Sequence, residues 1–373
     1  MTRRRKVLVI ILAVVAVGVM ASAMVISHNA PCVGRDAPAT AGASQMKAIV
    51  YRCYGSPDVL ALEDIDRPAL ADDEVLVRVR AASANPLDWH YMRGTPYIMR
   101  LDAGVGAPKV ARLGVDFAGT VEAVGRNVKR FQPGDEVFGA KQGAFAEYVA
   151  VREDRSLVQK PGNVTFEQAA SVPIAAVTAL QALRDKGGIQ AGQKVLINGA
   201  SGGVGTFAVQ IAKSFGAEVT GVCSTRNVEL VRSIGADRVI DYTREDFTTS
   251  AERYDLILDM VGNHSLMRLR RVLAPDGTLV IVGGKEGNWI SPMDRPIKAL
   301  ILSPFVGQEM VMLLAELNQT DLTFLADLMQ SGKLTPVIDR RYPLSQAAEA
   351  IRYLEDGHAR GKVVIVPDDN RPS

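Results

Sequence analysis

The most constraining feature of this 373-residue chain is a run of glycines between two short apolar segments. The first segment covers residues 194–198, and the stretch Gly-Ala-Ser-Gly-Gly-Val-Gly follows directly at 199–205. A helical pattern continues to Phe215, and after Gly216 a second apolar segment covers residues 218–222. This order predicts a strand, a tight turn, a helix and a second strand, which is the βαβ unit that binds dinucleotides. The helix N-terminus would face the pyrophosphate.

Three glycines in this stretch, Gly199, Gly202 and Gly205, are spaced three residues apart, close to the G-x-G-x-x-G fingerprint of dinucleotide-binding folds. A glycine-rich turn without a ligand has the same local pattern, but the flanking strand and helix patterns favour the binding turn. The candidate cofactor-binding residues at this turn are Ser201, Gly202, Gly203, Val204 and Gly205.

The residues after the second strand predict which dinucleotide binds. Folds that prefer NAD place an acid about 20 residues beyond the glycine turn, where it binds the ribose 2′-hydroxyl. Ser224, Thr225 and Arg226 occupy that region here, and none of them is acidic. Because a guanidinium and two hydroxyls suit a 2′-phosphate, we expect NADP(H) rather than NAD(H). A solvated arginine on a surface loop is the alternative.

The N-terminus has the pattern of a membrane segment. Residues 7–26 contain no charged side chain, and a helix of about 20 residues spans a bilayer. The basic run Arg3–Lys6 would hold the N-terminal end in the cytoplasm. A cleaved signal peptide is the alternative, because residues 21–23 resemble a small-residue cleavage site. A linker of small residues follows at 36–44, and the folded part begins near Met46.

This orientation would place the folded part outside the cytoplasm, where reduced nicotinamide cofactors are not normally supplied. The side of the membrane that it faces therefore stays open. The net charge of +2 gives no indication of nucleic-acid binding. Three cysteines, Cys32, Cys53 and Cys223, are too few for a disulfide framework, and the lack of a C-x-x-C pair argues against a structural zinc lobe.

Two regions with different periodicity follow the linker. Strand-like apolar runs separated by turn signals cover residues 47 to about 160, whereas strands and helices alternate from 194 to about 284. A capping box at Thr165–Gln168 begins a helical region that reaches Leu183, and Pro173 is expected to kink or divide it. The tail predicts helices near 307–317, 321–330 and 345–356 and a last strand at 362–366.

Ordered motifs extend along most of residues 46–367. They are Gly55–Leu60, Asn85–Asp88, Gly114–Val121, Gln132–Gly139, Gly143–Tyr148 and the glycine turn. On these motifs the chain resembles the medium-chain dehydrogenase/reductase superfamily, in particular its zinc-independent quinone oxidoreductase branch. The resemblance implies an α/β protein with a GroES-like β-barrel domain beside a Rossmann domain, whose parallel sheet is doubly wound. In this sequence one N-terminal transmembrane helix would precede them.

The expected parts are an N-terminal membrane anchor (or signal peptide) with its linker at 1–45, the GroES-like catalytic domain at 46–165, the Rossmann NADP-binding domain at 166–304 and a C-terminal return that completes the catalytic domain at 305–373.

Departures from the zinc-dependent branch of this superfamily predict a metal-free site. Those alcohol dehydrogenases place a cysteine where Asn85 stands and a His-Glu pair where Val115 and Asp116 stand. Valine cannot ligate zinc, and one carboxylate does not make a catalytic zinc site. His90 is expected to pack or to form a hydrogen bond rather than to ligate a metal. Without a Lewis acid, an acceptor that is already electrophilic fits better than an alcohol.

The resemblance implies four candidate catalytic residues. Asn85 would donate its amide N–H to the acceptor oxygen near the nicotinamide, or it would cap the following turn. Asp88 would hold Arg93 or order the loop. Tyr91 or Tyr97 would donate a proton to a reduced carbonyl, or both would pack on the wall of the substrate pocket.

Five further residues are candidates for cofactor contacts. Thr178 is expected near the nicotinamide ribose, or else bonded to carbonyls of its own helix. Tyr242 is expected to flank the adenine or the 2′-phosphate, or else to lie on the surface. Val261 and Gly283 end two later strands, at the edge where cofactors bind. Lys362 resembles a family position that faces the cofactor, or else it is a solvated lysine at a strand start.

We therefore expect a membrane-tethered, NADPH-dependent reductase that transfers hydride to a quinone or an α,β-unsaturated carbonyl without zinc. An NADP-dependent alcohol dehydrogenase and a tethered NADPH-binding interaction module without turnover are the alternatives. The resemblance also implies that two copies pair into a homodimer. The apolar segment 297–314 is expected in the core, or else at a substrate entrance or a subunit interface.

Overall fold

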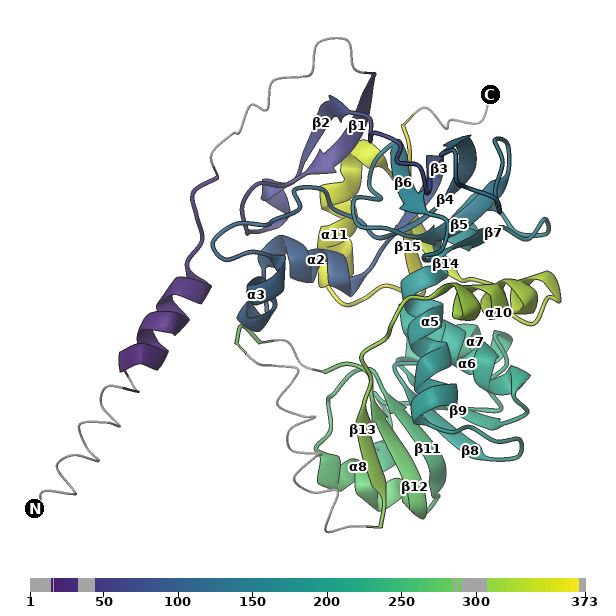
Figure 1. The fold of residues 1–373 in the computed structure, drawn as a ribbon. Helices are drawn as coiled ribbons and strands as arrows, with labels where there is room; N and C mark the ends of the chain where they lie inside the picture. The colour runs from purple at the N-terminus through teal and green to yellow at the C-terminus, as the bar shows by residue number, and fades with distance from the viewer. Residues whose placement is uncertain (1–14, 16, 33–43, 285–286, 290–306, 369–373) are drawn as a thin grey trace, which may run out of the picture.

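Two β-sheets of different kinds lie beside each other in the computed structural model (Figure 1). The structure describes residue 15 and residues 17–32, 44–284, 287–289 and 307–368. Helix α5 (Pro173–Gln181) lies between the two sheets, and its buried alanines share one core with strands of both. The site described below lies where these two sheets meet.

The larger part of the chain's middle forms a six-stranded sheet in which every pair is parallel. Its strands are β8 (Lys194–Asn198), β9 (Glu218–Cys223), β10 (Arg238–Asp241), β11 (Tyr254–Asp259), β12 (Leu273–Ile281) and β13 (Glu309–Met312). The order β10-β9-β8-β11-β12-β13 is the doubly wound order of dinucleotide-binding folds. The connecting helices are α6 (Gly203–Ser214), α7 (Val228–Ser233) and α8 (Leu266–Val272). The predicted Rossmann-type sheet is confirmed.

The second sheet combines strands from the first half of the chain with two strands from the tail. Its members are β3 (Glu74–Ala84), β4 (Asp116–Val124), β5 (Glu136–Ala140), β6 (Tyr148–Arg152), β7 (Leu157–Gln159), β14 (Ile338–Pro343) and β15 (Lys362–Val366). Strand β15 pairs antiparallel with β3, so that Val364 lies opposite Ser83. This pairing brings the start of β15 next to the end of β3, although nearly 280 residues separate them.

The remaining elements cover this sheet and its edge. They are the hairpin of β1 (Gln45–Val50) and β2 (Ala61–Asp66), and the helices α2 (Pro86–Arg93), α3 (Arg100–Ala103), α4 (Phe166–Ala170), α10 (Gln319–Gln330) and α11 (Ala347–Glu355). The capping box at Thr165 begins α4 as predicted, and Pro173 begins α5, so the predicted helical region is divided.

One predicted helix is wrong. Residues 307–317 were expected to be helical, but Glu309–Met312 form β13, which pairs parallel with β12. A short apolar run has the same composition in a buried strand and in a buried helix, so periodicity alone does not separate them. The Rossmann-type sheet therefore extends past the expected boundary at residue 304. Of the apolar segment 297–314, residues 297–306 lie outside the described residues.

A helix at residue 15 and residues 17–27 projects away from both sheets (Figure 1). Residues 7–14 and 16 of the expected transmembrane segment lie outside the described residues, as do 33–43 of the linker region. In the part of the chain that the structure describes, no helix combines the length and the apolar character needed to cross a bilayer. The described residues thus give no support to the predicted transmembrane helix.

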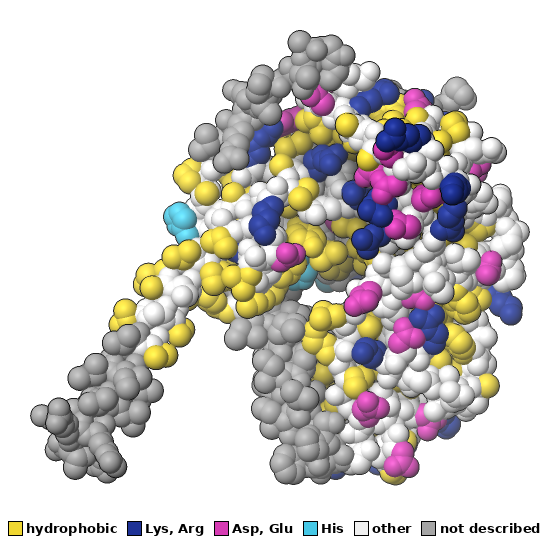
Figure 2. Space-filling model, in the orientation of Figure 1, with side chains coloured by type: hydrophobic (Ala, Val, Ile, Leu, Met, Phe, Trp, Pro, Cys, Tyr) yellow, Lys and Arg dark blue, Asp and Glu magenta, His cyan; other side chains and the backbone are white. Residues whose placement is uncertain are grey.

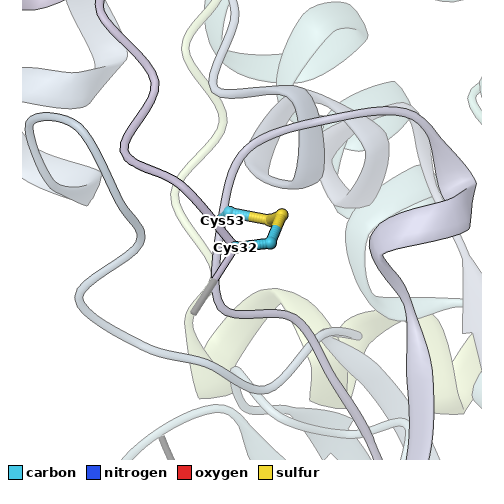
Figure 3. Close-up of a disulfide and its surroundings, with 2 residues drawn as sticks. All are labelled: Cys32 and Cys53. Carbon is cyan, nitrogen blue, oxygen red and sulfur yellow. A yellow bond between two sulfur atoms is a disulfide. The ribbon is translucent and has the colours of Figure 1, made fainter. Parts of the chain in front are cut away.

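A disulfide joins Cys32, just after this helix, to Cys53, in the loop that follows β1 (Figure 3). The two Cα atoms are 5.0 Å apart and the cysteines are separated by 21 positions in the sequence. The third cysteine, Cys223, is a buried free thiol. Three cysteines do not make a framework, but two of them make one crosslink that the sequence pattern did not predict.

Candidate active site

The glycine turn between β8 and α6 needs glycine for two separate reasons. Gly199 has a φ of 97°, in the region that favours glycine. A Cβ on Gly205 would lie 2.1 Å from the carbonyl oxygen of Gly199, so any side chain there would push the helix off the turn. Gly202, the N-cap of α6, is different, because a Cβ there would meet a single atom within 4 Å, at 3.5 Å. Its outer side is open.

That open side faces a cavity of roughly 560 Å³, bounded by residues of both sheets. The predicted site residues that line this cavity are Asn85, Ser201, Gly202, Gly203, Val204, Gly205, Ser224, Arg226, Tyr242, Val261 and Lys362. They come from the end of β3, the glycine turn, the carboxyl ends of β9, β10 and β11, and the start of β15. The structure therefore brings most of the predicted cofactor-binding residues to one place.

Three predicted cofactor-binding residues are not among the described residues that line the cavity. Thr178 donates its hydroxyl to the carbonyl of Ile174 at 2.7 Å, which is the alternative expected for a helix-interior threonine. Gly283 is required by packing, since a Cβ there would lie 2.4 Å from the carbonyl oxygen of Met260. Thr225 donates its hydroxyl to Asp241 at 2.6 Å.

The contact of Thr225 with Asp241 brings an acid next to the segment that, by sequence, contains none. Asp241 ends β10, and it also accepts the hydroxyl of Thr243 at 2.8 Å. These hydrogen bonds, led by that of Thr225, lower the pKa of the Asp241 carboxyl. Both hydroxyls thus hold the carboxylate in place.

Basic groups gather at the same end of the cavity. Arg226 lines it and donates from Nη2 to the carbonyl of His358 at 3.1 Å. Arg360 approaches the carbonyl of Arg226 with its own Nη2 at 3.5 Å. The exposed ring of Tyr242 lies at the same lining. The Arg226 guanidinium, the Tyr242 phenol and the Ser224 hydroxyl in one lining form a setting that suits a phosphate.

A buried polar cluster forms the opposite wall, where β15 meets β3. Lys362 donates from Nζ to Oδ1 of Asn85 at 2.5 Å, and the same Nζ lies 3.8 Å from Oδ2 of Asp116. Asn85 donates from Nδ2 to Oδ2 of Asp116 at 3.0 Å and to the carbonyl of Ser83 at 3.2 Å. Both amide hydrogens of Asn85 are therefore used inside the protein, and its oxygen holds the lysine.

Burial governs the protonation of this cluster. Asp88 accepts the backbone N–H of Asn85 at 2.7 Å, and burial raises the pKa of its carboxyl to about 8. Burial also raises the pKa of Asp116, against the opposing effect of the Lys362 ammonium. The pKa of Lys362 is lowered by burial, and Asp116 partly offsets that effect. Asp88 thus keeps a proton near neutral pH, whereas Lys362 and Asp116 each favour the charged form of the other against the effect of burial.

Of the other predicted catalytic residues, Asp88 belongs to this buried cluster, whereas Tyr91 lies further along α2 and Tyr97 begins the short helix at 97–99. Arg93 pairs with Glu355 of α11. Asp88 instead accepts the backbone N–H of Asn85, so of its two expected roles it has that of ordering the start of α2. Burial raises the pKa of Tyr91. Tyr97 packs edge-on against Trp289 with ring centroids 4.9 Å apart, and its N–H donates to the carbonyl of Asn288 at 2.7 Å. Asp88, Tyr91 and Tyr97 are not among the described residues that line the cavity.

Comparison with known proteins follows the same two-part division. Residues 71–162 match the family described as alcohol dehydrogenase GroES-like domain, and residues 234–365 match the family described as zinc-binding dehydrogenase. The 2-methylene-furan-3-one reductase of Solanum lycopersicum is 36% identical over 339 residues, which cover 87% of this chain and 80% of that protein. The chain belongs to the medium-chain dehydrogenase/reductase superfamily.

Two further relatives place this superfamily member in the quinone oxidoreductase-like branch. The chloroplastic NADPH-dependent alkenal/one oxidoreductase of Arabidopsis thaliana is 37% identical, covering 87% of this chain and 80% of that protein. The solved quinone oxidoreductase of Coxiella burnetii has a TM-score of 0.76 and 32% identity, covering 87% of this chain and 99% of that one. The chain is thus an NAD(P)H-dependent oxidoreductase of the medium-chain type, and its GroES-like and Rossmann-type parts are those of the superfamily.

The residues at the zinc position of this medium-chain dehydrogenase/reductase fold are engaged with one another. Asp116 accepts from Asn85, from the Ser83 hydroxyl at 3.2 Å and from the backbone N–H of Ile174 at 3.1 Å. His90 contacts the carbonyl of Thr95 through Nδ1 at 2.7 Å. Within the described ranges there is no group of three or more His, Cys, Asp or Glu side chains that would hold a metal ion.

A dinucleotide fits the donor set of this fold member, because open glycine backbone, a helix N-terminus and basic side chains line one cavity. Sequence reasoning missed several lining residues. They are Ala84, Pro86, Ile174, Ala175, Asn198, Val222, Cys223, Asn227, Met260, Asn263, Leu354, Gly357, His358, Ala359 and Gly361. Asn198 ends β8 and Met260 directly follows β11, next to the predicted residues, and this position at the carboxyl ends of parallel strands itself predicts a cofactor contact. His358 carries no such signal, because only the return of β15 brings it here.

Proposed function

We propose that this oxidoreductase transfers hydride from NADPH to a quinone or an α,β-unsaturated carbonyl, without a catalytic metal. The observation that carries the proposal is the buried pair of Lys362 and Asn85 on the wall of the cavity beside the glycine turn. A cation at this position meets the negative charge that forms when hydride reaches such an acceptor. The names of two relatives, an alkenal/one oxidoreductase and a 2-methylene-furan-3-one reductase, support this acceptor class.

Lys362 is, in this proposal, the group that stabilises and protonates the reduced acceptor. A bound nicotinamide would supply the hydride, and its addition to the acceptor carbon or oxygen would leave an enolate or a phenolate. Lys362 holds a proton for that anion at Nζ, and its lowered pKa makes it a better donor than an ordinary lysine. Asn85 positions the ammonium through its Oδ1, and Asp116 keeps the lysine charged between turnovers.

The preference for NADPH over NADH is part of the proposal. Ser224 and Arg226 line the cavity, and Arg360 lies next to Arg226. These groups give a 2′-phosphate at least one guanidinium fork and one hydroxyl. Asp241 is held as a carboxylate by the hydroxyls of Thr225 and Thr243, and Arg244, whose Nε lies 3.5 Å from its Oδ2, offsets the repulsion that this charge would exert on the phosphate.

An acceptor screen tests the proposed reaction. The full chain in detergent is mixed with NADPH and with a panel of benzoquinones, naphthoquinones, alkenals and enones, and NADPH oxidation is followed by absorbance. We expect turnover with at least one of these acceptors, unchanged by a metal chelator, and weaker turnover with NADH. Reduction of NADP+ by simple alcohols, with no turnover of quinones or enones, would instead identify an NADP-dependent alcohol dehydrogenase. Tight NADPH binding with no turnover would favour the interaction module.

We also propose that the N-terminal segment attaches the enzyme to a membrane. Residues 7–26 carry no charge and follow the basic run Arg3–Lys6. The described part of this segment, residues 17–27, is helical and exposes Val17, Val19 and Met20 to solvent. Retention of the full chain in membranes after an alkaline carbonate wash tests this attachment, and release into the supernatant would contradict it. Pairing into a homodimer stays a prediction.

A further inference from the structure

Exposed apolar side chains concentrate in two segments of this protein. Among the described residues, fifteen large apolar side chains are exposed, and six of them lie on the N-terminal helix. Four more, Ile98, Leu101, Val105 and Val110, lie on α3 and the turns beside it, and we call these four the α3 face. Figure 2 shows apolar side chains running along the projecting helix and onto the adjoining flank of the molecule. Such concentration marks a surface that meets an apolar partner.

The helix and the α3 face are fixed to each other by buried contacts. Arg100 of α3 is buried, and its Nη1 donates to the carbonyls of Ile26 at 3.0 Å and His28 at 3.1 Å. These carbonyls end the N-terminal helix, where a cation is stabilising. Ala30 donates its N–H to the carbonyl of Gly106 at 2.8 Å, and Gly106 directly follows Val105 of the α3 face. The helix therefore leaves the protein directly beside the α3 face.

The disulfide adds a covalent attachment to the same point. Cys32 follows Ala30 by two residues and is bonded to Cys53. The next residue is Tyr54, and the Arg100 guanidinium carbon lies over its ring, 4.4 Å from the ring centroid. The Tyr54 hydroxyl donates to the carbonyl of Gly104 at 2.7 Å. The end of the helix, Arg100 and the α3 face thus form one braced unit.

The chemistry of the helix identifies what covers this surface. Six successive residues, 17–22, are all exposed, and only one of them, Ser22, has a polar side chain. Such a helix is apolar around its whole circumference, whereas a helix that packs on a second copy would be apolar on one stripe. The basic run Arg3–Lys6 beyond it suits phospholipid headgroups. A lipid bilayer is the partner that accepts apolar side chains on every side.

We propose that the α3 face rests against the bilayer that holds the N-terminal helix, so that this flank of the GroES-like part faces lipid. The inference depends on the membrane attachment proposed above, but it adds a second contact and a fixed orientation. Lys109 is exposed next to Val110, and its long side chain reaches headgroups while the valine enters the apolar layer.

Tryptophan quenching in nanodiscs tests the orientation. The full chain carrying Trp289→Phe receives either Leu101→Trp on the α3 face or Asn127→Trp in the exposed turn after β4. Each variant is placed in nanodiscs of phosphatidylcholine with plain or brominated acyl chains. We expect brominated lipid to reduce the emission of the Leu101→Trp variant. The emission of the Asn127→Trp variant should be the same in plain and in brominated lipid. Buried Trp89 contributes the same background emission to both variants.

Each other outcome overturns the inference in a distinguishable way. If the chain stays with the nanodisc but tryptophan at position 101 is not quenched, the attachment stands and the α3 contact is wrong. If the chain does not stay with the nanodisc, the attachment itself fails. If exchange protection of residues 98–110 rises with protein concentration in lipid-free detergent, a second copy covers this face. Hydrogen exchange of the unsubstituted chain in nanodiscs, with protection expected at 98–110, gives the same answer without relying on a variant.

Discussion

The Nζ of Lys362 lies 2.5 Å from Oδ1 of Asn85, and both side chains are buried at the wall of the cofactor cavity. Lys362 begins β15 and Asn85 precedes α2, so the contact joins the tail of the chain to the catalytic loop. A lysine donor fixed by an amide oxygen is a proton source with a defined direction. The first prediction follows from this pair.

Replacement of Lys362 by methionine should lower turnover by about a hundredfold or more, the usual effect of losing a general acid. In the unsubstituted enzyme we expect turnover to fall as pH rises through the lysine pKa, which burial holds below its ordinary range beside Asp116 and Asp88. The methionine variant should lack that fall. Lys160→Met is the control, because Lys160 is also buried but pairs with Glu136 outside the cavity. Equal loss in both variants would contradict a role for Lys362.

Substitution of Asp88 by asparagine should flatten the pH dependence of stability. The folded pKa of Asp88, about 8, lies above the ordinary value of 3.8, so the folded state binds this proton more tightly. Its contribution is complete at acidic pH and is lost as pH rises from about 4 to about 8. Denaturant unfolding at intervals of about one pH unit between pH 5 and pH 9 measures how the free energy of unfolding changes with pH in both proteins. A slope unchanged by the substitution would contradict the raised pKa.

Alanine at two glycines of the turn should have opposite consequences. Gly205→Ala places a Cβ against the Gly199 carbonyl and should destabilise the fold by about 1–3 kcal/mol, as overpacking does. Gly202→Ala meets open space, so stability should change little while NADPH affinity falls. Thermal unfolding and nicotinamide fluorescence titration separate the two effects. Unchanged NADPH affinity in a folded Gly202→Ala variant would show that the turn does not face the cofactor.

Arg226→Ile should weaken NADPH binding about tenfold to a hundredfold, the loss expected for one charged hydrogen bond. NADH carries no 2′-phosphate, so its KM should stay nearly constant. Arg232→Ile provides the comparison, because Arg232 pairs with Glu229 on the exposed face of α7 and does not line the cavity. If both cofactors lose affinity equally, Arg226 does not read the phosphate.

Cleavage of the linker should not release the N-terminal helix. A protease recognition sequence inserted within residues 36–44 lies between Cys32 and Cys53, so the disulfide still joins the two fragments. On gels the cleaved chain should migrate as one species without reductant and as two with it. The same insertion combined with Cys32→Ser should give two species in both conditions. Separation of the cysteine-containing chain without reductant would show that the bridge is not formed.

Local pattern predicted the parts of the site that are local in the chain. The glycine turn, the end of β9 and Arg226 all lie within residues 199–226, and their periodicity and turn chemistry specify the βαβ unit. The contacts that involve distant segments were not predictable in this way. The Lys362–Asn85 bond depends on the pairing of β15 with β3, and the position of Asp241 beside Thr225 depends on the pairing of β10 with β9.

Two other differences have the same origin. Residues 309–312 form a strand because β12 offers them an open edge, and a short apolar run in the sequence does not reveal that edge. The Cys32–Cys53 bridge depends on where the N-terminal segment lies, which the count of cysteines does not determine.

The bridge between Cys32 and Cys53 joins the N-terminal helix to the folded body by a second covalent connection besides the linker. A flexible linker alone would let the folded body rotate freely relative to the helix. With two covalent routes and the Arg100 contacts between them, the body is restrained to move with the helix that carries it. Every copy would then present the mouth of its cavity at the same height and angle, so an acceptor would always approach from one direction.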